Sequence, residues 1–150
     1  MIKPVLSDDS LLADIKAASG DTEHWRLWWL GQSGFLVQWQ NKHLLIDPYL
    51  SDSLTKKYAA TDKPHIRMTE IPIDPARLDF TDVVTSSHNH TDHLDHETLW
   101  PLIAANPGFE MFTFNTETPE EFVASCENIG QSYCALRCGE RWSSSRLTAN

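Results

Sequence analysis

Three histidines and one aspartate lie within six positions of one another, at His88, His90, Asp92 and His93. They follow the short run 82–85, whose valines are typical of a strand. If the extended conformation continues, its period of two residues turns His88, His90 and Asp92 to one face of the chain. His93 then approaches from the following turn. Imidazole suits zinc, iron and nickel, and a carboxylate among the nitrogens also admits manganese. The spacing predicts ligands for two adjacent metal ions.

The residues around this motif indicate the elements that hold it. Residues 85–87 are small and leave room beside a metal ion. Asp95 is a favourable helix cap, and Pro101 fits the first turn of a helix that we expect to end near Asn106. The alternative is a solvated, histidine-rich loop without specific metal binding. We predict a strand, a ligand loop and a helix, in that order.

The motif matches the His-x-His-x-Asp-His signature of the metallo-β-lactamase superfamily at all four defined positions, and the chain resembles that superfamily from about residue 25 to 107. Upstream, residues 29–37 and 44–49 look like the opening hairpin of its L-ascorbate-6-phosphate lactonase-like branch. The longer form over 87–95 is also similar to N-acyl phosphatidylethanolamine phospholipase D. These motifs separate the superfamily well and the substrate poorly.

The resemblance implies an α+β fold, the αββα sandwich, and a two-metal site. It implies that His88 and His90 bind one metal ion, while Asp92 and His93 bind the other. A hydroxide held between the ions would attack the substrate, and Asp92 would orient it as the candidate catalytic residue. Asp47 matches an aspartate that supports the ligand loop, although a strand-ending turn is an equally good account of it.

The implied cofactor is a pair of zinc ions, with manganese as the alternative. Metal ions lower the pKa of bound water and polarise a scissile carbonyl or phosphoryl group. The expected function is therefore metal-dependent hydrolysis of an ester, lactone, amide or phosphodiester, with a small molecule as the substrate.

The sequence departs from the family pattern after the motif. A complete site takes a later histidine, a bridging aspartate and a final histidine, but the last histidine is His96 and the last aspartate is Asp95. None of the downstream glutamates or cysteines has a matching context. We therefore expect residues 1–108 to form the N-terminal half of the domain and residues 109–150 a divergent or truncated tail.

A half domain has consequences for stability and activity. The strand faces around Trp28, Phe35, Val37 and Leu45 would lack their partner layer, so the chain should be marginal alone or pair with a second copy. Activity would require a partner chain or unusual tail ligands. The alternative function is a catalytically inactive fragment with residual metal binding.

The composition of the chain limits which partners and which cellular location we expect. Twelve Lys and Arg stand against twenty-one Asp and Glu, a formal net charge of −9, which disfavours nucleic acid. Apolar runs are far shorter than the roughly 20 residues of a membrane span. The first residues lack the apolar core of a secretion signal, and three cysteines form no disulfide framework. We predict a cytoplasmic protein.

Periodicity predicts the other elements. We expect an amphipathic helix over 10–19 and a three-stranded meander over 25–30, 35–39 and 43–47. A further strand is expected over 109–114 and a short helix over 119–125. His24, His43 and His65 read as ordinary surface or turn residues.

The long segment 49–79 is polar and is the one locally basic region of the chain. It is expected to be a loop, with its cations either solvated or presented to an anionic substrate. These cations are Lys56, Lys57, Lys63, Arg67 and Arg77.

Overall fold

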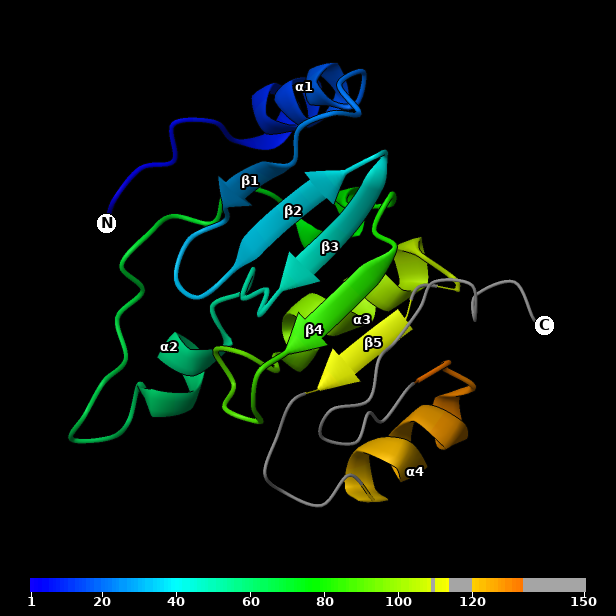
Figure 1. Ribbon diagram of the computed structural model, residues 1–150. Helices are drawn as coiled ribbons and strands as arrows, with labels where there is room; N and C mark the ends of the chain where they lie inside the picture. The colour runs from blue at the N-terminus through cyan, green and yellow to red at the C-terminus, as the bar shows by residue number, and fades with distance from the viewer. Residues whose placement is uncertain (109, 114–119, 134–150) are drawn as a thin grey trace.

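A single mixed sheet forms the centre of the computed structural model, which describes residues 1–108, 110–113 and 120–133 (Figure 1). Its strands follow the order of the sequence: β1 (Arg26–Trp29), β2 (Phe35–Trp39), β3 (Lys42–Ile46), β4 (Val83–Ser86) and β5 (Glu110–Thr113). The first three strands are antiparallel, and β3, β4 and β5 are parallel to one another. The predicted meander is therefore confirmed.

Helices fill the connections that parallel strands require. The segment between β3 and β4 contains α2 (Ser53–Tyr58) and the short helix η1 (Pro75–Arg77), and α3 (His96–Ala105) connects β4 to β5. Helix α1 (Asp8–Ala18) precedes the sheet and α4 (Glu120–Ile129) follows it. Helices α1, α3 and α4 match the predicted helices, although residues 109, 114 and 119 of the predicted tail elements lie outside the described residues. The prediction that segment 49–79 is a loop was wrong for α2 and η1, since contacts with residues distant in sequence, such as that of Ser53 with Asp95, hold α2. None of the helices in the described part of the chain is long and apolar enough to span a bilayer.

The hydrophobic core lies between the sheet and the helices α1 and α3. Because strand side chains alternate between faces, every second strand residue reaches this core. Leu36, Leu45 and Val84 are buried there, as are Leu11 and Ile15 of α1 and Leu99 and Leu102 of α3. Helix α3 lies behind the sheet in Figure 1.

The opposite face of the sheet is also apolar and is much more exposed. Leu27 pairs with Val37 and Trp29 pairs with Phe35, so these four side chains share that face. Leu27, Trp29 and Trp39 are 49%, 52% and 53% exposed. The prediction of exposed apolar surface holds for this face but was wrong for Leu45 and Trp28, whose side chains point to the helices. Leu45 is fully buried, and Trp28 is partly buried against the core.

Helix α3 begins where the sequence predicts, at the cap Asp95. Its carboxylate accepts hydrogen bonds from the backbone N–H groups of Glu97 and Thr98. The prediction that Pro101 occupies the first turn was wrong, since the proline lies inside the helix. The capping bonds of Asp95 start the helix at His96, and a proline without an N–H group leaves the carbonyl of Glu97 without its helical donor.

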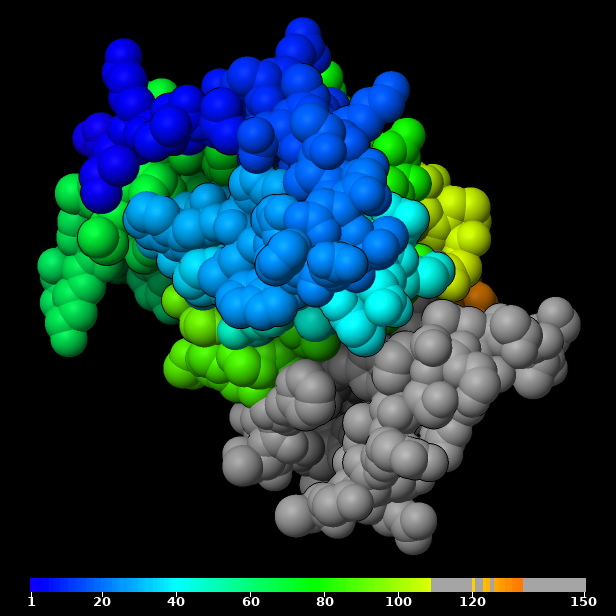
Figure 2. Space-filling view, turned by 45° about the horizontal axis from the view of Figure 1, so that its top comes forward, coloured from blue at the N-terminus to red at the C-terminus, as the bar shows by residue number. Residues whose placement is uncertain are grey.

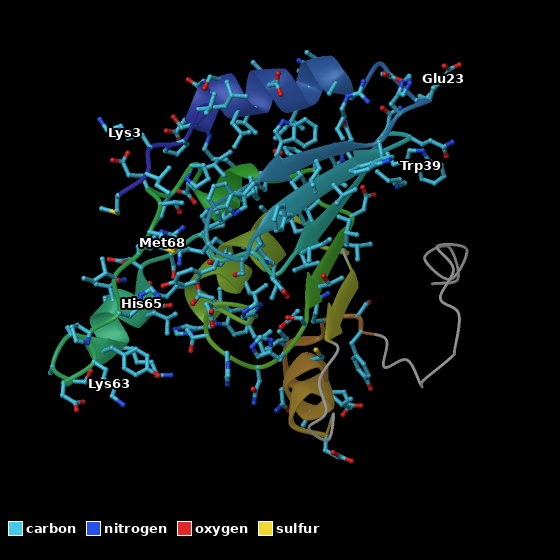
Figure 3. The ribbon with its side chains drawn as sticks, turned by 60° about the vertical axis from the view of Figure 1, so that its left-hand side comes forward. Lys3, Glu23, Trp39, Lys63, His65 and Met68 are labelled. Atoms are coloured by element: carbon cyan, nitrogen blue, oxygen red, sulfur yellow. The ribbon has the colours of Figure 1, made fainter. Side chains whose placement is uncertain are left out.

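The segment around α2 and the loop after it projects from the body of the molecule (Figures 1 and 2). Lys63 and His65 lie on this loop, at the end of the molecule away from Trp39 and Glu23 (Figure 3). His43, which was predicted to be a surface residue, has a side chain only 11% exposed and packs edge-on against Phe80, with ring centroids 4.7 Å apart. His43 pairs with the buried Gln38, so its side chain lies on the face of the sheet that the helices cover.

Candidate metal centre

The motif loop starts directly after β4. The strand ends at Ser86, and the extended conformation that would align the ligands does not continue. Instead, the N–H groups of His93 and Leu94 both donate to the carbonyl of His90, at 2.8 Å each. This turn brings His93 back toward His88. The ring centroids of His88 and His93 lie 4.0 Å apart, and those of His88 and His90 lie 4.6 Å apart.

Asp47 lies at the end of β3 and holds the beginning and the end of this loop together. Its carboxylate accepts hydrogen bonds from the Ser87 N–H at 2.6 Å and the Ser87 hydroxyl at 2.8 Å. It also lies 2.9 Å from Nδ1 of His93. An ionised carboxylate only accepts, so Nδ1 carries the proton and Nε2 presents a lone pair. That is the arrangement in which a second carboxylate orients a histidine ligand.

The electrostatics of this pair agree with its geometry. Asp47 is 8% exposed. Burial alone would raise its pKa, but the hydrogen bonds from His93 and Ser87 outweigh burial and hold the pKa below its ordinary value. Nε2 of His93, on the far side of the ring, lies 3.5 Å from Oδ2 of Asp92. The carboxylates of Asp47 and Asp92 thus lie on opposite sides of the His93 ring.

A serine from the β1–β2 turn reaches the same loop. The hydroxyl of Ser33 donates to the carbonyl of Asp92 at 2.5 Å and lies 3.3 Å from the carbonyl of Asp47. Gly31 has φ 87°, and a Cβ there would collide with the Thr69 hydroxyl, so the turn requires glycine. Sequence reasoning missed Ser33. Its small polar side chain in the turn 31–34 was the only available signal.

Asp95 fixes the other end of the motif from within the protein. This carboxylate is fully buried and accepts a hydrogen bond from the Ser53 hydroxyl at 2.9 Å and from the Thr98 hydroxyl at 2.6 Å. The Thr98 hydroxyl in turn accepts from the N–H of Leu50 at 2.8 Å. Through these contacts the N-terminus of α2 is held against the helix that follows the motif.

The basic residues of segment 49–79 have different environments. Lys56 pairs with Glu97 at 2.7 Å, and Arg77 pairs with Asp8 at 3.5 Å and with Asp9. Arg67 is 5% exposed, and burial lowers its pKa. Lys57 differs from these because its ammonium donates to the Thr91 hydroxyl, inside the motif, at 3.3 Å. The prediction of a solvated or substrate-facing loop is therefore wrong for Arg67.

Arg67 serves a structural purpose. Its guanidinium donates to the carbonyls of Tyr49, Ser51 and Thr69 and lies over the Tyr49 ring, 4.8 Å from the centroid. Buried among carbonyls, it clamps the segment that leaves Asp47.

The donor types at this site fit a divalent cation, since imidazole nitrogens and a carboxylate are its common ligands. The structure brings these side chains near one another but does not point their donor atoms at a common position. In the described part of the chain, no group of three or more His, Cys, Asp or Glu side chains is arranged to hold a metal ion. His88, His90 and His93 pack ring against ring instead. Cys134 and Cys138 lie outside the described residues.

Comparison with known proteins agrees with the motif. Residues 26–131 match the family model described as Beta-lactamase superfamily domain, and the chain therefore belongs to this family. Among curated proteins, it is 37% identical over 71 residues to the mitochondrial N-acyl-phosphatidylethanolamine-hydrolyzing phospholipase D of Saccharomyces cerevisiae, which covers 47% of this chain and 14% of the relative. It is 29% identical over 111 residues to a UPF0173 metal-dependent hydrolase of Saccharolobus solfataricus, covering 69% of this chain and 40% of the relative.

A solved structure supports the fold. The crystal structure of an isothiocyanate hydrolase from Delia radicum gut bacteria aligns with a TM-score of 0.53 and 22% identity, covering 77% of this chain and 43% of that one. The α+β fold of the metallo-β-lactamase type is therefore confirmed. The chain spans less than half the length of each of these proteins. The family match also includes β5 and α4, further than the resemblance that ended near residue 107.

Proposed function

We propose that this chain supplies the metal-binding half of a metal-dependent hydrolase, with His88, His90, Asp92 and His93 as the ligands. The observation that carries this proposal is the Asp47 carboxylate, which accepts hydrogen bonds from both Ser87 and His93 and turns Nε2 of His93 away from itself. A solvated histidine loop would not need such a buried anchor. Family membership and a metal-dependent hydrolase among the relatives support the same function.

The proposed cofactor is zinc, with manganese as the alternative. A divalent ion held by these side chains would supply Lewis acidity for the hydrolysis of an ester, lactone or phosphodiester. Asp92 is the proposed catalytic carboxylate. Its backbone is fixed by Ser33, and its side chain lies beside His93 and remains 41% exposed, which leaves it accessible to substrate. The lactonase-like branch stays our prediction for the substrate class, and the remaining donors must come from outside the described residues or from a second chain.

A second candidate function is metal binding without catalysis. The packing of the three imidazole rings against one another favours it, because rings in contact must rotate before their nitrogens converge on one ion. Both candidates place the same residues at the site. They differ in whether substrate is turned over.

Metal content of the purified chain tests the proposal. We expect zinc to co-purify with the wild type and to be lost from the double variant His88→Ala/His90→Ala. The double variant His24→Ala/His96→Ala removes the same number of imidazoles elsewhere and should keep its metal. Equal metal in all three proteins would contradict the proposal. Hydrolysis of a lactone, an ester or a phosphodiester by the zinc-loaded chain supports the hydrolase, and its absence with zinc bound supports the second candidate.

A further inference from the structure

Two neighbouring lysines on α2 point in different directions. Successive residues on a helix are turned by roughly 100° from each other. The ammonium of Lys56 reaches Glu97 on α3 at 2.7 Å, while that of Lys57 reaches the Thr91 hydroxyl at 3.3 Å. Thr91 stands between His90 and Asp92, two of the proposed ligands. The fold therefore places one of these lysines at the site and pairs the other with a carboxylate.

The position of Lys57 is built into the fold. The base of α2 is held by two buried hydrogen bonds, from the Ser53 hydroxyl to Asp95 and from the Leu54 N–H to the Tyr49 hydroxyl. Asp95 also caps the helix that follows the motif. The helix that carries Lys57 and the helix that follows the Thr91 loop are thus attached to the same carboxylate, which restricts how far Lys57 and Thr91 can separate.

The charge of Lys57 is not neutralised by its partner, since Thr91 contributes a hydroxyl. Lys56 and Arg77 pair with carboxylates, Arg67 is buried among carbonyls, and Lys63 lies on the projecting loop (Figure 3). An exposed ammonium beside metal ligands attracts negatively charged groups locally. This matters in a chain of formal net charge −9, which otherwise repels an anionic substrate.

We infer that Lys57 is a specificity-determining residue, which selects substrates that carry a phosphate-type anionic group and holds that group beside Thr91. The inference rests on the proposed function, because an anion at this position is a substrate only if the neighbouring side chains hold metal. Without a bound anion, the Lys57 ammonium donates to the Thr91 hydroxyl. When an anion binds, the ammonium would donate to the anion in place of this neutral acceptor. Charge-assisted hydrogen bonds of this kind are the stronger ones.

Binding of methyl phosphate to the purified full chain, measured by calorimetry with and without zinc, tests this inference. We expect Lys57→Gln to raise the dissociation constant of methyl phosphate about tenfold, because glutamine cannot form the charge-assisted hydrogen bond to the anion. Lys56→Gln removes the same charge from the adjacent position and should change it less than about twofold. Trimethyl phosphate keeps the phosphoryl group but carries no charge, and its binding should not distinguish the three proteins. The backbone amide signal of Thr91 should shift with methyl phosphate in the wild type.

The outcomes separate this inference from the proposed function, because zinc content is measured on the same samples. Zinc binding without any difference between the lysine variants overturns the role of Lys57 and leaves the metal site intact. Equal weakening in both variants shows a general charge effect and also overturns it, as does a wild type that does not bind methyl phosphate. Binding that depends on Lys57 in a chain without zinc supports anion recognition and counts against the proposed function alone.

Discussion

Two buried carboxylates lie next to the histidine motif, and they have different hydrogen-bond partners. Asp47 and Asp95 are 8% and 0% exposed. Each accepts a hydrogen bond from a serine hydroxyl, and Asp47 accepts from one backbone N–H group while Asp95 accepts from two. The remaining partner of Asp47 is the ring of His93, whereas that of Asp95 is the hydroxyl of Thr98. The first carboxylate orients a candidate ligand, and the second starts a helix.

The segment 47–53 joins these two carboxylates and explains how they act together. It begins at Asp47, and its Leu50 N–H and Ser53 hydroxyl reach Thr98 and Asp95. A loop fixed at both ends holds its neighbours with less freedom than a loop fixed at one end. We therefore expect Asp95 to contribute mainly to folding stability and Asp47 mainly to metal affinity.

Replacing Asp95 should have the largest effect. Asp95→Ala removes the acceptor of four hydrogen bonds, two from hydroxyls and two from the first turn of α3. Loss of a helix cap together with buried, unsatisfied donors should lower the free energy of unfolding by about 3 kcal/mol. Urea denaturation followed by circular dichroism measures this. Glu97→Ala breaks the exposed pair with Lys56 and should cost less than about 1 kcal/mol. Similar losses in both variants would show that Asp95 is not the structural anchor.

Replacing Asp47 should affect metal affinity more than stability. Asp47 has φ 45°, a left-handed conformation that asparagine tolerates, so Asp47→Asn removes the charge with little backbone strain. Loss of a carboxylate that orients a histidine ligand typically weakens metal binding by about 10- to 100-fold. Zinc titration against a competing chelator measures the dissociation constant. Asp82→Asn, at the opposite end of the same strands, should leave it unchanged. If Asp47→Asn instead destabilises the chain as much as Asp95→Ala, the two carboxylates do not differ as proposed.

The contrast between the two carboxylates also shows what could be read from the sequence. Asp95 was predicted as a cap because capping depends on residues one to three positions away. The meander and the sheet-to-helix order around the motif were predicted for the same reason, since strand alternation and helix capping are local signals. The family motif assigned Asp47 its position beside the ligands. The division of the chain at residue 108 stays a prediction.

Contacts between distant residues could not be predicted in this way. Ser33 and Asp92 are 59 positions apart, and nothing in either neighbourhood indicates their hydrogen bond. The five cations of segment 49–79 look alike in sequence, yet packing buries Arg67 and pairs Lys56 and Arg77. Trp28 and Trp29 likewise differ only in the face they occupy, because alternation predicts two faces and not which one the helices cover.

Ser33 tests whether a third, smaller support holds the Asp92 end of the loop. Ser33→Ala removes one hydroxyl that reaches the carbonyls of Asp47 and Asp92. A single hydrogen bond contributes about 1 kcal/mol, so the zinc dissociation constant should rise by about fivefold, less than in Asp47→Asn. The same chelator titration measures it. Ser19→Ala, which removes a serine hydroxyl at the end of α1, is the matched control. An unchanged constant in Ser33→Ala would show that Ser33 does not support the ligand loop.

The smallest expected effect comes from the end of the sheet away from the motif, where Asp82 accepts from the backbone N–H of His43 at 2.8 Å. Burial lowers the pKa of His43 below 6.5, although the nearby Asp82 opposes this shift. A lowered folded-state pKa means that the unfolded chain binds the proton more readily than the folded chain does. The free energy of unfolding is therefore highest above pH 6.5, where His43 is neutral in both states, and it declines as the pH falls through that value. Urea denaturation at about pH 7.5 and about pH 5.5 should show a larger loss in the wild type than in His43→Gln. Zinc affinity at the higher pH should be the same in both proteins, since this histidine lies at the opposite ends of the strands from the ligands. A change in zinc affinity in His43→Gln would show that the two ends of the sheet are coupled, and the roles given to Asp47 and Asp95 would then need to include that coupling.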